Sequence, residues 1–309
     1  INRKSGNVSD FCRRWGKRYR YAVVLDADSL MSGRLLTTMV RIMEKNSGIG
    51  ILQTFPRQIA AETLLGRVMQ FAQALYGPPF AYGLDYWQCG EANFWGHNAI
   101  LRLAPFIEDC ALPPLPGKEP FGGHILSHDF VEAALMRKAG YAVRLLPSLR
   151  GSYEEGPPTL IDMLKRDRRW CQGNMQHIWL LFAKKWHPMS RLNFLHGILS
   201  YASSLLWLLF LVFATALAAL PNGRELERTQ TAEQLLLGLT IALIFLPKTV
   251  ILLDEQLTGR MFKPLRQRLL TSVSSLLDTV IFTLMAPVLM IFHARSEEHT
   301  SELQSPCNL

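Results

Sequence analysis

An uncharged run of 27 residues, Phe194–Leu220, most constrains what this 309-residue chain can fold into. As a helix it would measure roughly 40 Å, enough to cross the apolar core of a bilayer with some tilt. Two further apolar runs follow, Leu235–Leu253, which is interrupted by Pro247-Lys248, and Leu269–His293. The sequence therefore predicts three membrane-spanning helices near the C-terminus, with a lipid bilayer as their partner.

Basic residues around these runs predict their orientation. One cluster precedes the first run and another follows the second, and together they consist of Lys184, Lys185, Arg191, Arg260, Lys263, Arg266 and Arg268. Because Lys and Arg concentrate on the cytoplasmic side of membrane proteins, we expect residues 1–190 and 254–268 to face the cytoplasm. The five cysteines form no C-x-x-C pair, which suits the same reducing compartment.

The two ends of the chain differ from its middle in composition and in the structure that they predict. The chain opens on Ile1, without an initiator Met, in a basic stretch with no helix or strand start. Residues 295–309 change abruptly to a polar composition and resemble translated sequencing-adapter sequence, so we expect a non-native tail there. The expected organisation is a cytoplasmic domain over residues 1–190 that lacks its N-terminal part, a membrane domain over residues 191–294, and this tail.

Short apolar runs alternate with helical patterns in the first 190 residues. Buried strands are predicted at Tyr21–Leu25, Gly48–Thr54 and Tyr141–Leu146. Helices are predicted at Leu35–Glu44, Ala60–Leu75, His128–Lys138 and Thr159–Gln172, and Gly77-Pro78-Pro79 should end the second of them. Residues 104–123 are rich in Pro and Gly and predict a long loop. This alternation favours an α/β domain with a mostly parallel sheet.

Asp26-Ala27-Asp28 follows the first predicted strand directly. Carboxylates at positions i and i+2 of a strand share a face. Mg²⁺ or Mn²⁺ on a diphosphate takes one or two such carboxylates together with phosphate oxygens. We interpret the pair as the metal site for a nucleotide-activated substrate, with a surface turn as the alternative. A haloacid-dehalogenase phosphatase is a further alternative, but Leu30 stands where that motif has Thr or Val.

Two more groups of residues could complete a transfer site. Asp129 begins a predicted helix, where a carboxylate can act as a general base or can simply complement the helix dipole. Arg166, Arg168, Arg169 and Trp170 combine guanidinium groups that suit a diphosphate with an aromatic face that suits a sugar ring. The alternative for this cluster is a basic helix that lies on anionic lipid.

Other binding functions find little support in the sequence. His124 and His128 have the spacing of two zinc ligands on a helix, but the H-E-x-x-H glutamate and a third ligand are missing. The net charge of +8 comes without a zinc finger, an RNA-binding sheet signature or a helix-turn-helix pattern. We therefore expect no nucleic acid partner.

In this order the motifs resemble those of the membrane-integrated family-2 inverting glycosyltransferases, which include cellulose and hyaluronan synthases. The family pattern D-x-D, [T/S]-[E/H]-D and [Q/R]-x-x-R-W is met by Asp26-Ala27-Asp28, Ser127-His128-Asp129 and Arg166-Asp167-Arg168-Arg169-Trp170. Within the family the chain is most similar to the bacterial glucosyltransferases of osmoregulated periplasmic glucan synthesis. The segments that carry this likeness are Tyr19–Ser29, Gln53–Pro56, Gly90–Ile100 and His128–Ala133.

The resemblance implies a GT-A-type (Rossmann-like) α/β catalytic domain followed by transmembrane helices. It implies a multi-pass protein of the bacterial inner membrane, with the catalytic domain in the cytoplasm. The donor would be UDP-glucose, and the acceptor would be a growing glucan chain, extended as a β-1,2-linked backbone. The cofactor would be Mg²⁺ or Mn²⁺ on Asp28, with Asp26 nearby. A cellulose- or hyaluronan-type synthase and a catalytically inactive membrane protein remain alternatives.

The roles of single residues follow from the same resemblance. Asp129 would deprotonate the acceptor hydroxyl. The nucleotide and diphosphate would contact Lys4, Asp26, Arg166 and Arg169, and Lys4 belongs to a stretch that resembles the family's K-A-G-N loop. The acceptor would contact Trp170, Glu91, Trp95, His97 and Asn98. Because the family's first Asp would precede Ile1, we expect the isolated chain to be inactive.

Asp278 stands inside the third apolar run. A carboxylate near the centre of a membrane helix costs about 2.5–3.5 kcal/mol on insertion scales, so it should face protein or water. We consider two roles for it, lining a path for the glucan or pairing with a neighbouring helix.

Overall fold

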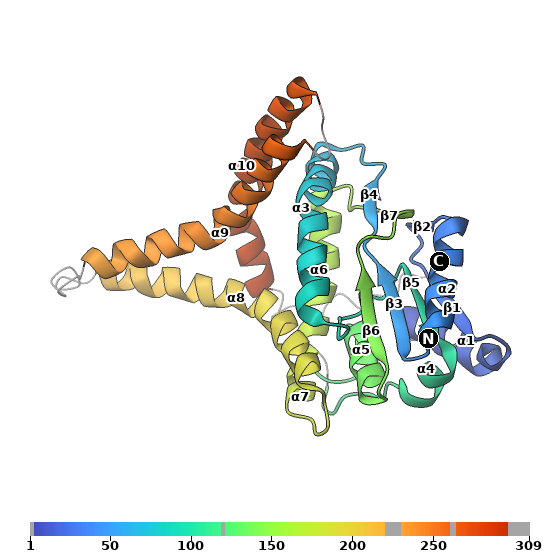
Figure 1. Cartoon of the computed structure of the whole chain (residues 1–309). Coiled ribbons are helices and arrows are strands. Elements are labelled where there is room, and N and C mark those ends of the chain that lie inside the picture. The colour runs from blue at the N-terminus through green and yellow to red at the C-terminus, as the bar shows by residue number, and fades with distance from the viewer. Residues whose placement is uncertain (1–2, 119–120, 220–229, 260–263, 296–309) are drawn as a thin grey trace.

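The computed structural model describes residues 3–118, 121–219, 230–259 and 264–295. An α/β part comes first and three long helices follow it (Figure 1). Two helices of the α/β part, α3 (Leu64–Gln88) and α6 (Leu160–Gln176), lie between the sheet and the long helices and contact them. The predicted order of an α/β domain followed by three long apolar helices is confirmed.

The main sheet has four strands in the order β1-β5-β3-β6. These strands are β1 (Tyr21–Val24), β5 (Ala99–Arg102), β3 (Ile49–Thr54) and β6 (Ala142–Leu146). Only β3 and β6 form a parallel pair, because β5 runs antiparallel to both of its neighbours. The prediction of a mostly parallel sheet is therefore wrong, and the sheet is mixed.

A second, smaller sheet joins β2 (Ser29–Met31), β7 (Ser152–Glu155) and β4 (Arg57–Ile59) in the order β2-β7-β4. Within it Ser29 is paired with Glu154. This register brings β7 beside the end of the Asp26-Ala27-Asp28 motif, although about 125 residues separate the two in the chain.

Strand β3 is covered on both faces, as its continuous apolar sequence predicts. Ile51 belongs to one core cluster, with Met136 and Val143, and Leu52 belongs to another, with Met39. Helix α2 (Gly33–Lys45) supplies one cover, and its N-terminus is capped by Ser32, whose Oγ accepts from the Leu35 backbone at 3.3 Å. Helices α1 (Arg3–Arg14), α4 (Leu103–Asp109) and α5 (His128–Lys138) contribute to the other side.

Several local predictions are corrected by the structure. The N-terminal stretch forms α1 and a short 3-10 turn, η1 (Gly16–Arg18), because its apolar residues Val8 and Cys12 pack onto the core. Part of the predicted long loop forms α4. Strand β1 is half-buried, not buried, because it lies at an edge of the sheet and leaves Val23 39% exposed.

Helix α3 is the largest departure from the predicted elements. It continues through Pro78 and Pro79, where the sequence predicts its end. A proline inside a helix removes a backbone hydrogen bond and costs about 3 kcal/mol. Contacts with two of the long helices offset this cost, including a 2.7 Å hydrogen bond between the Tyr76 hydroxyl and Ser275 Oγ.

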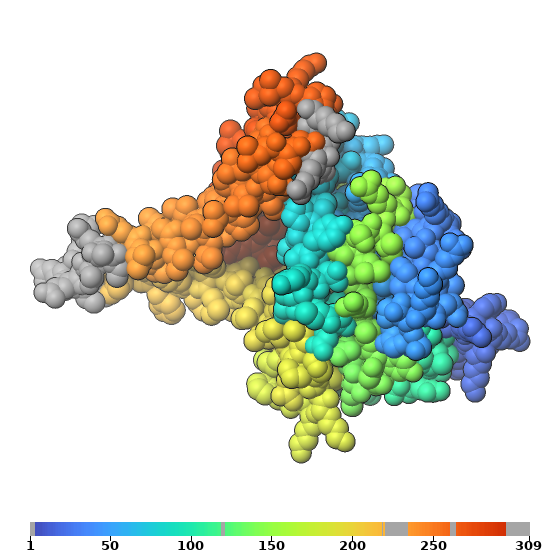
Figure 2. All heavy atoms as spheres, in the orientation of Figure 1, coloured from blue at the N-terminus to red at the C-terminus, as the bar shows by residue number. Residues whose placement is uncertain are grey.

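The three long helices are α8 (Pro188–Ala219), α9 (Gln230–Thr258) and α10 (Leu265–Arg295), which follow a short helix, α7 (Ile178–Leu181). Each is long and apolar enough to cross a membrane, and this confirms the three predicted spans. Pro247 does not interrupt α9. In Figure 2 the yellow α8 and the orange α9 project away from the α/β body, with apolar surface exposed along them.

Asp278 of α10 is fully buried and pairs with Lys248 of α9, with 2.7 Å between Nζ and Oδ2. The ammonium group of Lys248 also lies over the ring of Tyr76 of α3, 5.2 Å from its centroid. The structure thus favours the pairing role for this carboxylate over a place on a glucan path.

Among the residues that the structure describes, Cys12, Cys89, Cys110 and Cys171 form no disulfide. The tail expected at residues 295–309 lies outside the described residues from position 296 onward.

Candidate active site

The Asp26-Ala27-Asp28 motif lies in a turn between β1 and β2. The turn is closed by a hydrogen bond of 3.1 Å from the Ser29 backbone nitrogen to the Asp26 carbonyl oxygen. The strand alternation that we used to place both carboxylates on one face therefore does not apply, since β1 ends at Val24. Asp28 is exposed and Asp26 is half-buried, and Lys4 of α1 donates a charged hydrogen bond to Asp26 Oδ1.

Glu154 of β7 is a candidate residue that the sequence did not single out. Burial raises its pKa, the charges of Asp28 and Asp26 raise it further, and the charges of His97 and Arg166 lower it. Glu154 therefore faces the acidic turn, a histidine and the basic helix α6 at once. Its only sequence signal is a glutamate on a short strand that ends at Gly156-Pro157-Pro158.

Asp129 lies in the first turn of α5, as predicted, and is half-buried. Burial raises the pKa of its carboxyl to about 6, the positive charge of His128 opposes this, and the charge of Glu132 adds to it. His128 is itself held by Glu132, with 3.0 Å between Nδ1 and Oε1. A carboxylate with a pKa near 6 is still ionised at neutral pH and is a stronger base than an ordinary aspartate.

Lys4 acts on both the acidic turn and His128, the residue next to Asp129. It bonds to Asp26, and its charge is also near enough to His128 to lower the pKa of that imidazole. Burial lowers the pKa of His128 as well, but the hydrogen bond and charge of Glu132 outweigh both effects and raise it overall. The first two sequence motifs, about 100 residues apart in the chain, therefore both lie within the electrostatic reach of Lys4.

Helix α6 brings the third motif to the same place. Its N-terminus is capped by Thr159, whose Oγ1 accepts from the Asp162 backbone at 3.2 Å. The Arg166 guanidinium stacks on the Trp170 ring at 4.5 Å and its charge acts on Glu154. Arg169 and Trp170 are exposed, so both side chains are available to a ligand.

The segment before β5 lies against the base. At Gly96, where φ is +84°, a Cβ atom would lie 3.2 Å from Asp129 Oδ2, so the backbone needs a glycine to approach this closely. The neighbouring Trp95 is half-buried and packs edge-on against Phe55. His97 lies 3.7 Å from Glu154, measured from Nε2 to Oε2. Trp95 and His97 thus stay candidates for contact with an acceptor.

Two other predicted acceptor residues have different partners in the structure. Asn98 is fully buried and donates from Nδ2 to Ser152 Oγ at 2.7 Å, so it supports β7 and does not face a ligand. Glu91 binds Arg137 at 2.9 Å and His187 at 3.0 Å. Arg137 is eight residues from Asp129 along α5, or roughly 12 Å, so Glu91 lies toward the opposite end of this helix. We therefore propose scaffold roles for Asn98 and Glu91 in place of the predicted acceptor contacts.

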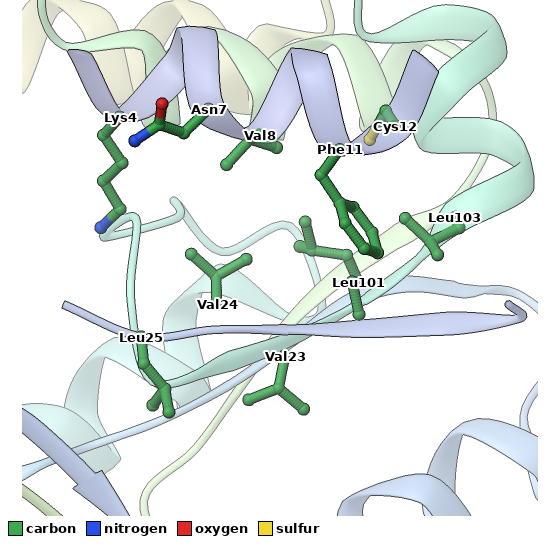
Figure 3. Close-up of a pocket in the computed structure, with 11 residues that line it drawn as sticks. Lys4, Asn7, Val8, Phe11, Cys12, Val23, Val24, Leu25, Leu101 and Leu103 are labelled. Carbon is green, nitrogen blue, oxygen red and sulfur yellow. The ribbon is translucent and has the colours of Figure 1, made fainter. Parts of the chain in front are cut away.

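A cavity of about 380 Å³ lies between α1 and β1, next to this constellation (Figure 3). Figure 3 shows Val8 and Phe11 of α1 pointing toward the strand, with Lys4 at one end. The remaining lining is apolar except for Asn7. A diphosphate would find only one cation here, so the cavity adjoins the acidic turn without being the phosphate site itself.

The acidic turn fits a divalent cation of the predicted kind. Within the described part of the chain no three acidic, histidine or cysteine residues are grouped closely enough to hold a metal alone. Mg²⁺ commonly needs only one or two protein carboxylates, because substrate phosphates and water complete its octahedron. Asp28, exposed at the turn, and Asp26 match that ligand set. The same finding gives no support to a zinc site at His124 and His128.

Comparison with known proteins gives a consistent result. A family model described as "Glycosyl transferase family group 2" matches residues 21–253. Proteins named "Glucans biosynthesis glucosyltransferase H" from Pseudomonas syringae pv. tomato, Pseudomonas fluorescens and Pseudomonas putida are each 50% identical to the chain, over 96% of its length. The chain spans 36% of the length of these relatives.

Proposed function

The chain belongs to glycosyl transferase family group 2, and on this premise we propose that it carries the catalytic centre of a membrane-bound glucosyltransferase. The donor is UDP-glucose, and the acceptor is a growing glucan chain, extended as a β-1,2-linked backbone. The relatives' name supports glucose as the sugar and a glucan as the product. UDP and the linkage rest on the family resemblance of the motifs.

The observation that carries the proposal is that the segment Gly96-His97 reaches both Asp129 and the neighbourhood of the acidic turn. A Cβ atom at Gly96 would lie 3.2 Å from Asp129 Oδ2, and His97 lies 3.7 Å from Glu154, which is paired with Ser29 at the end of the turn. An inverting transfer needs a base for the acceptor hydroxyl beside a site that holds the donor diphosphate. Asp129 accepts the hydroxyl proton while the acceptor oxygen attacks the anomeric carbon from the face opposite the leaving group. The bond from that carbon to the diphosphate oxygen breaks, and UDP leaves with the electron pair.

The residues around the leaving group are suited to its charge. Lys4, Arg166 and Arg169 offer positive charge, and guanidinium groups can bind phosphate oxygens in a bidentate manner. Asp28 and Asp26 would hold Mg²⁺ or Mn²⁺, which supplies further charge neutralisation on the diphosphate when bound. Trp170, exposed beside Arg166, offers a face for a sugar ring of the acceptor, with Trp95 and His97 on the side of β5.

We place the catalytic part in the cytoplasm of a bacterium and the three long helices in its inner membrane. The apolar surface of α8, α9 and α10 supports the membrane assignment, and the basic residues before α8 and in the first turns of α10 support the orientation. A glucan made at the cytoplasmic face could then be delivered across the membrane that the helices of the same chain span.

The test is UDP release from membranes that carry the chain within the full-length frame of its relatives, supplied with a panel of UDP-sugars. Mg²⁺-dependent release with UDP-glucose, and a β-linked glucan as the product, are the expected results. Asp129→Asn should lower the rate by about 10²–10⁴-fold. Asp109→Asn, an exposed aspartate of α4, is the matched control and should keep the rate.

Each failure has a separate meaning. Release with another UDP-sugar would mean that glucose is not the transferred sugar, while the assignment as a transferase would stand. Release that Asp129→Asn does not change would reject Asp129 as the base. No release with any donor would favour a catalytically inactive membrane protein.

A further inference from the structure

The C-terminal end of α6 holds the loop that leads to Asp129. Gln176, the last residue of α6, is 1% exposed, and its side-chain amide is used three times on the backbone of residues 122–126. Its Nε2 donates to the carbonyl oxygens of Gly122 and His124, both at 3.1 Å. Its Oε1 accepts from the Leu126 backbone nitrogen at 2.9 Å.

The next residue, His177, continues the same attachment. It is fully buried, and its Nε2 lies 3.1 Å from the carbonyl oxygen of Ser127, two residues before Asp129. Because a carbonyl only accepts, Nε2 must carry the proton. Burial lowers the pKa of His177 to about 4, so the imidazole is neutral at physiological pH and keeps this tautomer.

Gly173 lets the two segments approach this closely. A Cβ atom at Gly173 would lie 2.2 Å from Ser127 Oγ and 2.7 Å from the Ser127 backbone nitrogen. Any side chain at position 173 would therefore push α6 away from the residues that precede the base. The contact is made one turn after Trp170 on the same helix.

These contacts join the parts of the proposed site that must keep a fixed distance. Helix α6 carries Arg166 and Trp170, and the loop it holds leads into α5, whose first turn carries Asp129. The His177 ring also lies 5.3 Å from the ring of Phe130 and 5.0 Å from that of Phe194 of α8. The base, the basic cluster and the first membrane helix thus share one buried attachment.

We propose that Gln176 and His177 are positioning residues that hold Asp129 at a fixed place relative to the Arg166–Trp170 cluster, a role that rests on the transfer reaction proposed above. Residues 122–127 form no helix or long strand, so their buried backbone groups need partners from elsewhere. A displacement of about 1 Å at a reacting group can lower a rate on the order of 10²-fold. Precise support of this loop therefore bears directly on the chemical step.

Gln176→Met tests the amide, because Met has a similar length and removes all three hydrogen bonds without adding a charge. In membranes that carry the chain in the full-length frame of its relatives, kcat should fall about 10–100-fold. The KM for UDP-glucose should stay within about twofold, since the donor-side residues Lys4, Asp26 and Asp28 are not touched. A purely structural role would instead lower the amount of folded protein and leave kcat per folded molecule unchanged.

Gln73→Met is the matched control on another helix. Its amide also serves backbone groups, donating to the Pro56 carbonyl at 2.6 Å and accepting from the Gln58 nitrogen at 3.0 Å, but these belong to β4 and the residue before it. It should lose comparable stability and keep kcat. An equal loss of kcat in both variants would overturn the proposal.

His177 gives a second test that does not depend on the fate of Gln176→Met. His177→Gln keeps an N–H near the position of Nε2, whereas His177→Leu removes it and keeps an apolar volume. Turnover per folded protein should be within about threefold of the unchanged protein for Gln, and about 10-fold or more lower for Leu. Equal turnover in the two variants would overturn the proposal. If the unchanged protein releases no UDP, the proposed function fails instead.

Discussion

Two carboxylates, one half-buried in the α/β part and one fully buried in the membrane part, show how partners decide what burial does. Burial raises the pKa of Asp129 in the α/β part to about 6, although the charge of the neighbouring His128 opposes this shift. Asp278 of the membrane part is fully buried and is joined to Lys248 at 2.7 Å. The first suits the proposed exchange of a proton, and the second joins α9 to α10. Burial of an acidic residue therefore indicates function only when its partners are known.

The largest expected effect comes from breaking the membrane pair. Lys248→Met leaves Asp278 buried without its cation, which should lower the free energy of unfolding by about 3 kcal/mol. We choose the lower end of the usual range because the Lys248 side chain is 35% exposed. Thermal unfolding in detergent measures the change. Lys184→Met, at an exposed position, is the control and should have little effect.

The double variant Lys248→Met/Asp278→Leu sharpens this test. Replacing both partners of a buried ion pair by apolar residues is often neutral, so the double variant should recover most of the lost stability. Recovery would show that the pair is structural. A double variant as unstable as the single one would mean that Asp278 has a further role that Lys248 does not explain.

The pH dependence of turnover is the next effect in size, and it concerns the other carboxylate. Asp129 acts as a base only when deprotonated, so kcat/KM should fall about tenfold per pH unit below a midpoint near 6 and level off above it.

The same ionisation of Asp129 changes the stability of the fold with the opposite sign. The raised pKa means that folding favours the protonated form, so this contribution to stability falls as pH rises from about 4 to about 6.

His128→Gln tests whether the neighbouring charges set that midpoint. The positive charge of His128 lowers the pKa of Asp129, so its removal should move the midpoint to higher pH. His196→Gln, at an exposed position of α8, should leave the midpoint unchanged. If the midpoint stays fixed in His128→Gln, the loss of kcat/KM at low pH does not report the protonation of Asp129.

The smallest effect is expected at the other end of α5. Glu91→Gln weakens the pairs with Arg137 and His187, which are partly exposed, and should cost about 1 kcal/mol of stability with less than twofold change in turnover. Thermal unfolding and an acceptor titration measure both quantities. A tenfold rise in the acceptor KM would indicate that Glu91 contacts the acceptor and would contradict its proposed scaffold role.

Local signals in the sequence predicted many of the elements correctly. The apolar period of Leu35, Met39 and Met43 predicts α2, and the three long apolar runs predict α8, α9 and α10. Gly140, with φ at +89°, follows the end of α5 as a helix stop. These features depend on residues a few positions apart, so a single sequence contains them.

The sequence failed where distant contacts outweigh local preference. Pro78 and Pro79 signal a helix end, yet α3 continues through them because its neighbours in the membrane part support it. Strand β5 gives no sign that it runs antiparallel between β1 and β3. Glu154 was missed because only the pairing of β2 with β7 brings it to the acidic turn.

By itself the sequence determined that this chain has an α/β part and three apolar spans, and it named the acidic turn, the base and the basic helix in their order. Only the tertiary structure decided which of those residues meet. It joined Lys4 to Asp26, brought Glu154 to the turn, and assigned Asn98 and Glu91 to the scaffold. The reason is physical. Periodicity, caps and apolar length are short-range properties of the chain, whereas the position of a side chain depends on strand register and helix packing between residues far apart in sequence.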